Sequence, residues 1–233
     1  MTVLAKTQSI GLNQLDNNQV GSILARVPIL RNLKAANQDQ FNELLMTCRQ
    51  LEFTCGELVL QRGSIDNSLY FLLAGQLAVY HHHRDGRLPL NYIVPGEMFG
   101  DLALLDGTER RASVFVDDNC RKARVLAMDF SSFGNLNDFS RVKLATKLSF
   151  YHAIVHGIRW RLELKRMENR DHPLVDVVRR LPVFKGVKGS LAELGYLHDQ
   201  AERLASLLTG WDGNGICDAE MLAVQPVSPG SVD

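Results

Sequence analysis

Several features that would assign a protein of this size to a class are missing from the 233-residue sequence. No stretch approaches the about 18 consecutive apolar residues that a membrane-spanning helix needs. The N-terminus lacks a basic region followed by an apolar block, so we expect no secretory signal. The four cysteines, at positions 48, 55, 120 and 217, show neither a CxxC pair nor metal-ligand spacing. Because free thiols fit a reducing compartment, we expect a cytoplasmic protein without membrane contact.

Motifs of catalytic chemistry are also missing. The sequence holds no G-x-S-x-G, P-loop or HExxH motif and no carboxylate pair at helical spacing in a candidate cleft. Three consecutive histidines begin at His81, but on a strand only His81 and His83 share a face, and no carboxylate or cysteine completes a metal site. We therefore expect neither an enzyme nor a metal site.

Net charge is absent too, since 26 basic residues balance 26 acidic ones. The charge is nevertheless unevenly placed. Residues 141–188 hold twelve Lys and Arg against four Asp and Glu, and residues 189–233 hold one against seven. The basic stretch is either an anion-binding face or a solvated helix that the acidic segment partly neutralises. The second interpretation is the commoner one for long helices.

Helical patterns precede the central part of the chain. After a polar arm over residues 1–19, which we expect to be flexible, apolar residues recur at helical spacing from Val20 to Val27. A second helical pattern follows over residues 32–53. Its apolar face consists of Phe41, Leu44, Leu45 and Cys48. The sequence therefore predicts helices at the N-terminal side of the domain.

The pattern changes near residue 54. From there to about residue 130, short runs of β-favouring residues alternate with glycines, which is typical of strands joined by turns. Asp85-Gly86 is a hairpin signal, because glycine reaches the positive φ of tight turns. Many short strands without βαβ spacing predict an antiparallel, jelly-roll-like β-roll. The expected strands are 57–61, 68–75, 76–83, 90–94, 112–116 and 123–129.

A helical period returns over about residues 139–169. Apolar residues there step alternately by four and three positions, which is an a/d seam of nearly three heptads. The seam consists of Leu144, Leu148, Tyr151, Val155, Ile158 and Leu162. It is buried against the β-roll, against a second copy of the chain, or against both, so residues 141–166 are the candidate homodimer contact.

The domain organisation follows from these patterns. One domain is expected over residues 20–165, followed by a helical extension over 170–209 and a disordered, polar tail over 210–233. The predicted fold class is α+β: a β-roll flanked by N-terminal helices and a long C-terminal helix.

The chemistry of the sequence is concentrated in FGDLALLDGTERRASV, residues 99–114. Asp101 follows a glycine, and Arg110 lies nine positions later beside small residues. A carboxylate can accept hydrogen bonds from the vicinal hydroxyls of a ribose, and an arginine can bind a phosphate through two parallel bonds. Gly100 and Ala112 leave backbone N–H groups accessible to an anion. These residue types predict a site for a ribose joined to a phosphate.

This stretch resembles the phosphate-binding cassette of cyclic nucleotide-binding domains, the family shared by catabolite-activator-type bacterial regulators and the regulatory subunits of cAMP-dependent protein kinase. The glycine-and-strand framework over residues 56–80 is similar to the family's as well, and the resemblance covers about residues 20–165. It implies a non-enzymatic, bacterial-type signalling protein. Its ligand would be cAMP or else cGMP, and its long C-terminal helix would transmit binding to an unidentified protein partner.

The resemblance also implies roles for individual residues. Asp101 would hold the ribose 2′-hydroxyl and Arg110 the cyclic phosphate. The neighbouring ligand-binding positions are Gly100, Leu102, Arg111, Ala112 and Ser113. On the long helix, Tyr151 and Trp160 are the candidates for a group that covers the base.

Three residues depart from the family pattern. Asp101 is one methylene shorter than the family's glutamate, Glu109 replaces a proline of the kinase-type pattern, and Arg111 replaces a small residue. The alternative function is therefore a cassette that has lost its nucleotide and serves as a protein-interaction module.

A second alternative is a catabolite-activator-like transcription regulator, which would need a helix-turn-helix. Only residues 191–208 could form one, and Gly195 comes one position early for the turn. The helix after it carries Asp199 and Glu202 against a single arginine, Arg203. A recognition helix facing phosphates is net basic, so the sequence disfavours nucleic acid as a partner.

Overall fold

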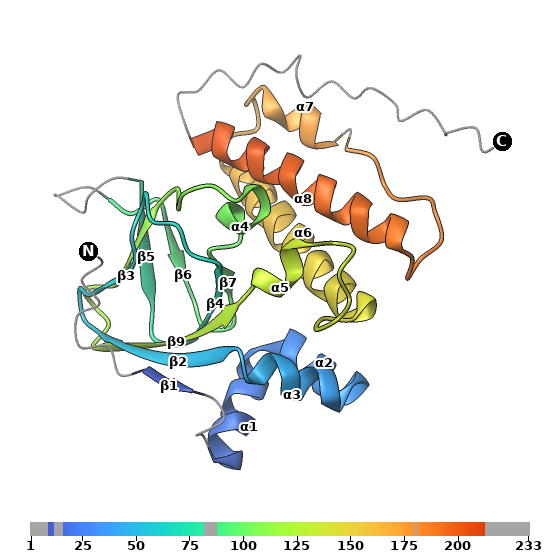
Figure 1. Ribbon diagram of the computed structural model, residues 1–233. Coiled ribbons are helices and arrows are strands. Elements are labelled where there is room, and N and C mark those ends of the chain that lie inside the picture. The colour runs from blue at the N-terminus through green and yellow to red at the C-terminus, as the bar shows by residue number, and fades with distance from the viewer. Residues whose placement is uncertain (1–8, 12–15, 82–87, 180, 213–233) are drawn as a thin grey trace.

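The computed structural model describes residues 9–11, 16–81, 88–179 and 181–212. A β-roll lies beside two long helices, α6 (Leu144–Glu168) and α8 (Leu191–Asp212), and three short helices lie at one end of the roll (Figure 1). Within these ranges, no helix is long and apolar enough to cross a membrane.

The roll consists of two antiparallel sheets. One has the strand order β1-β2-β9-β4-β7 and the other the order β3-β8-β5-β6. The strands of the first sheet are β1 (Ser9–Gly11), β2 (Cys48–Thr54), β9 (Lys122–Asp129), β4 (Ser68–Ala74) and β7 (Met98–Phe99). Those of the second are β3 (Leu58–Leu60), β8 (Ser113–Val116), β5 (Leu77–Tyr80) and β6 (Asn91–Ile93).

The inner faces of the two sheets pack together. Leu72 and Val125 from the first sheet, and Leu77 and Val116 from the second, belong to one cluster and have no exposed surface. Burial of apolar side chains from both sheets holds the roll closed. The predicted α+β fold with an antiparallel β-roll is confirmed. The hairpin signal at Asp85-Gly86, together with His82 and His83, lies outside the described residues.

The N-terminal helices are α1 (Asn17–Arg26), α2 (Pro28–Ala36) and α3 (Gln38–Leu45). Asp16 begins α1 with a capping box, and Pro28 occupies the first turn of α2, where its missing N–H costs nothing. The two helices therefore begin where the sequence places a cap and a proline.

Two segments differ from the sequence analysis. The helical pattern over residues 32–53 ends at Leu45, and Cys48–Thr54 form β2, which pairs with β9 along its whole length. The prediction of helix was wrong there, because Cys48 continues the helical spacing by chance while backbone pairing with β9 decides the conformation. In the arm expected to be loose, Ser9–Gly11 form β1 and pair with β2.

The apolar seam of α6 is buried within this chain. Leu148, Tyr151, Val155, Ile158 and Leu162 are all less than a tenth exposed, and α8 packs alongside α6 (Figure 1). The buried face of α8 steps by three and four positions as well. Its members are Leu194, Leu197, Ala201, Leu204 and Leu208. A second copy is therefore not needed to cover the seam, and a homodimer through residues 141–166 stays a prediction.

The helix α8 is continuous through Gly195, with no turn inside residues 191–212. The helix-turn-helix alternative for this segment is therefore wrong. A short helix, α7 (Leu174–Arg179), precedes α8, and the short helices α4 (Leu102–Asp106) and α5 (Ser131–Gly134) complete the described elements. The tail beyond Asp212 lies outside the described residues.

Candidate nucleotide-binding site

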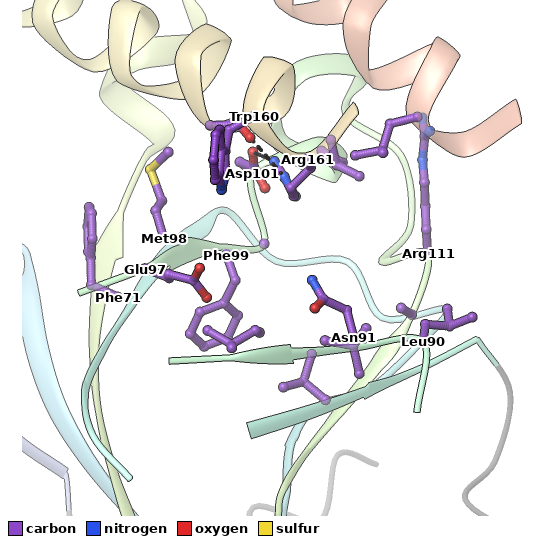
Figure 2. A pocket seen from close by; sticks show the side chains of 18 of the residues that line it. Phe71, Leu90, Asn91, Glu97, Met98, Phe99, Asp101, Arg111, Trp160 and Arg161 are labelled. Carbon is purple, nitrogen blue, oxygen red and sulfur yellow. Dashed lines mark hydrogen bonds and ion pairs between the residues drawn. The ribbon is translucent and has the colours of Figure 1, made fainter. Parts of the chain in front are cut away.

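A cavity of about 660 Å³ lies between the β-roll, the cassette and α6. Figure 2 shows Glu97, Met98 and Phe99 on one side, Leu90 and Asn91 below, and Trp160 with Arg161 above. Six predicted ligand residues line it: Gly100, Asp101, Leu102, Arg110, Arg111 and Ala112. Ser113 does not line it, because this side chain is buried and its Oγ accepts a hydrogen bond from the Arg62 N–H at 3.0 Å.

Arg110 is held in place by a carboxylate that sequence analysis missed. Its side chain is only 2% exposed, and Asp66 accepts from Nε at 3.1 Å and from Nη2 at 2.6 Å. The carbonyl oxygens of Ser68 and Gly100 accept from Nη2 and Nη1. Such a forked pair fixes the plane of the guanidinium as well as its position.

The ionised form of Asp66 is stabilised by this contact. Partial burial raises the pKa of its carboxyl, but the hydrogen bonds and charge of Arg110, with smaller contributions from Ser68, outweigh burial and leave the pKa below its usual value. A guanidinium has five N–H groups, two of them on Nη1. Within the described part of the chain, Nη1 donates to the Gly100 carbonyl alone, so one of its N–H groups has no acceptor there, and Arg110 is among the residues that line the cavity.

Gly100 is required by the geometry around Arg110. Its φ is +79°, and a Cβ there would lie 2.9 Å from Arg110 Nη1 and 3.0 Å from Tyr70 Cδ2. The Tyr70 ring stacks on Phe99 with centroids 5.2 Å apart, and Arg110 lies over the same ring at 5.6 Å. A side chain at position 100 would displace either the arginine or the aromatic pair.

Asp101 lies at the start of α4 and is 1% exposed. Its Oδ2 accepts a hydrogen bond from Nη2 of Arg161 on α6 (Figure 2). Its Oδ1 is buried and has no hydrogen-bond partner among the described residues. Leaving a buried acceptor unsatisfied costs about 1–3 kcal/mol. Asp101 therefore brings to the cavity lining a carboxylate with one acceptor oxygen that the described residues do not satisfy.

The two candidates for covering a base lie in different places. Tyr151 is buried beside Phe130 and His198, away from the cavity. Trp160 lines the cavity and is 55% exposed, so its ring is accessible to a ligand (Figure 2). Only Trp160 is placed for that role.

Asp66 and Arg161 had no signal in the sequence that separates them from their neighbours. Asp66 lies in a polar turn 44 residues before Arg110, and Arg161 is one of several basic residues on α6, 60 residues after Asp101. Their roles follow only from contacts between distant segments. The two remaining departures from the family pattern also differ in place, since Glu109 is exposed and Arg111 donates to Thr209 on α8.

Comparison with known proteins finds relatives for this segment of the chain. Residues 50–136 match the sequence model of the cyclic nucleotide-binding domain family. The chain is 29% identical over 104 residues to a cAMP-dependent protein kinase regulatory subunit of Neurospora crassa, covering 45% of this chain and 26% of the subunit. It is 35% identical over 65 residues to a cyclic AMP receptor protein of Thermus thermophilus, covering 27% of this chain and 30% of the receptor. The chain thus spans about a quarter of the first of these relatives and under a third of the second.

A solved structure shares the fold. The crystal structure of a cyclic nucleotide-binding domain from Methylobacillus flagellatus superposes with a TM-score of 0.54 at 13% identity, covering 76% of this chain and 92% of that one. The sequence match falls on the segment that carries the cassette and most of the roll. Residues 50–136 of this chain are therefore similar in sequence to cyclic nucleotide-binding domains, and the chain has the fold of such a domain.

Proposed function

We propose that this chain is a cyclic nucleotide receptor, with cAMP as its first candidate ligand and cGMP as the second. The observation that carries the proposal is the buried Oδ1 of Asp101, a residue that lines the 660 Å³ cavity, because this oxygen has no hydrogen-bond partner among the described residues. A ribose hydroxyl would donate to this oxygen. The phosphate would lie against Arg110, which lines the same cavity and keeps one Nη1 N–H without an acceptor among the described residues.

The remaining walls suit a nucleoside. The exposed ring of Trp160 offers a flat apolar surface on which a base can stack, and Asn91 offers an amide that can donate and accept hydrogen bonds (Figure 2). Gly100 keeps the backbone close to the phosphate position. The site thereby provides one group for each part of the ligand: base, sugar and phosphate.

Binding would be transmitted through α6. Arg161 on this helix bonds Asp101, so a ribose on Asp101 changes the environment of an ion pair that joins the cassette to the long helix. A ligand that binds one arrangement of these elements more tightly shifts the population towards it. The receptor would present that arrangement of its C-terminal helices to a protein partner, without catalysing a reaction.

Calorimetric titration with cAMP tests the proposal. We expect a saturable signal for the wild type, a much weaker one for Asp101→Ala, and none for 5′-AMP at the same concentration, since the open nucleotide has a different phosphate geometry and charge. Arg110→Ala should also abolish the signal, but its burial makes a folding control by circular dichroism necessary. Absence of heat with cAMP and cGMP at millimolar concentration would refute the proposal.

The second candidate is a protein-interaction module whose cavity stays without nucleotide. One observation favours it: Arg161 already neutralises Asp101, and Asp66 already neutralises Arg110, so both charges are compensated inside the chain. This candidate predicts that a partner captured by the protein is retained equally by the wild type and by Asp101→Ala, with no effect of added cAMP.

A further inference from the structure

The C-terminal end of α8 forms part of the cavity wall. Leu208 and Thr209 line the same cavity as Arg110 and Asp101, and α8 also packs against the cassette helix α4. Arg111 joins the two segments directly, because its Nη1 donates a hydrogen bond to Oγ1 of Thr209. Figure 2 shows the Arg111 side chain extended from the cassette to the ribbon of α8 along one edge of the cavity.

The hydroxyl of Thr209 is set up as an acceptor. Oγ1 donates its own hydrogen to the carbonyl of Ala205 at 2.8 Å, one turn earlier in α8. The oxygen lone pairs therefore remain for a donor from outside the helix, and Arg111 supplies it. The bond between Arg111 and Thr209 therefore joins a charged donor to a neutral acceptor.

The contacts of α8 differ between its two ends. Near the N-terminal end, Glu193 bonds His152 of α6 at 3.2 Å and the Gly189 N–H at 2.6 Å. Near the C-terminal end, the Arg111–Thr209 bond is a polar link to the cassette, and Trp211 stacks on His172 with centroids 4.1 Å apart. A change at Arg111 would therefore be felt mainly by the last turns of α8.

We propose that Arg111 is shared between the ligand's phosphate and α8, so that nucleotide binding withdraws Arg111 from Thr209 and loosens the last turns of this helix. The proposal rests on the proposed function, since it needs an anion in the cavity. A phosphate oxygen carries a negative charge that the Thr209 hydroxyl lacks, so it attracts the Arg111 guanidinium more strongly. Thr209 holds the Arg111 side chain extended along the edge of the cavity, and a phosphate inside the cavity would draw the guanidinium away from that position.

This arrangement makes α8 a ligand-controlled element of the receptor. The contact between Arg111 and Thr209 stabilises the packed position of the last turns of α8 and weakens ligand binding. By linkage, ligand binding destabilises this packed position by the same free energy. The last turns of α8 contact Arg111 through Thr209, and α8 packs against α4 and α6. Release of these turns would expose a surface of α4 and α6 in the ligand-bound receptor that α8 covers in the empty one.

The test compares cAMP affinity in single and double variants. Thr209→Val keeps the shape of the side chain but removes the acceptor, so we expect cAMP to bind about two- to tenfold more tightly. In an Arg111→Gln background the same Thr209→Val change should have no effect on affinity. Ser149→Ala is the matched control, because it removes a hydroxyl that makes the same bond to the carbonyl four residues earlier, on an exposed position of α6.

Hydrogen exchange gives a second readout that affinity alone does not. Saturating cAMP should speed exchange of the amides over residues 205–212 in the wild type and leave them unchanged in Arg111→Gln. If the wild type binds cAMP but Thr209→Val binds it equally or more weakly, the sharing of Arg111 is wrong and the receptor function stands. If the wild type binds no nucleotide, both proposals fall together.

Discussion

Replacing Asp66 by alanine tests whether the site depends on a carboxylate outside the cassette. The change leaves the guanidinium of Arg110, only 2% exposed, without its counter-ion. Removing one partner of a buried ion pair costs about 3–5 kcal/mol. Because the Asp66 side chain is 34% exposed, water can replace part of the lost contact. We therefore expect a loss of about 2–3 kcal/mol in the free energy of unfolding, and a Tm lower by roughly 5–10 °C.

Urea and thermal unfolding followed by circular dichroism measure this loss. Glu43→Ala is the control, since Glu43 pairs with Arg141 at 3.3 Å but both side chains are about half exposed, and such a pair contributes less than about 1 kcal/mol. The double variant Asp66→Ala/Arg110→Met should recover part of the loss, because it removes the unpaired charge as well. Equal stability of Asp66→Ala and Glu43→Ala would refute the reasoning.

Three further predictions follow from the same contacts. The pKa of Asp66 is lower in the folded chain than in the unfolded one, so the stability that its ionised form contributes is present above about pH 4 and is lost as the pH falls through the folded pKa. The difference in unfolding free energy between the wild type and Asp66→Asn should therefore shrink on acidification. A difference that grows would contradict the assignment. Gly100→Ala should destabilise the fold by more than the about 1–3 kcal/mol of backbone strain and prevent cAMP binding. Gly107→Ala, at φ +63° with no atom near its Cβ, should show the strain alone, so equal losses of stability in the two variants would count against a steric role for Gly100. Burial raises the pKa of the Cys48 thiol to about 12, so a thiol reagent at pH 8 should modify the exposed Cys55 and leave Cys48 unmodified until the protein unfolds, and labelling of native Cys48 would show that this site opens.

The cassette can be predicted from a short stretch of sequence, but the residues that hold its charged side chains in place cannot. Gly100, Asp101 and Arg110 lie within eleven positions, so their residue types and spacing suffice to predict a sugar–phosphate site. Asp66 and Arg161 reach the site from segments 44 and 60 residues away, and nothing in their own surroundings distinguishes them from ordinary surface charges. Only the closed roll and the position of α6 bring them to the cavity.

The same limit applies to the helices. The a/d spacing on α6 correctly predicts a buried face, but spacing cannot name the partner, and the face is covered by α8 rather than requiring a second copy. Near Cys48, helical spacing and strand pairing compete, and pairing with β9 wins because it satisfies the backbone of the whole segment. The spacing of apolar residues identifies which face of an element is buried, whereas long-range contacts determine which other element covers that face.

The most direct test of the account compares cAMP with 2′-deoxy-cAMP, which lacks the hydroxyl assigned to Asp101. Since a hydrogen bond to a charged group contributes about 1.5–3 kcal/mol, the wild type should bind cAMP at least roughly tenfold more tightly than the deoxy analogue. Asp101→Ala should bind the two ligands with equal, weaker affinity. Equal affinity of the wild type for both ligands, or no saturable binding of either at millimolar concentration, would contradict the claim that this cavity is a cyclic nucleotide site.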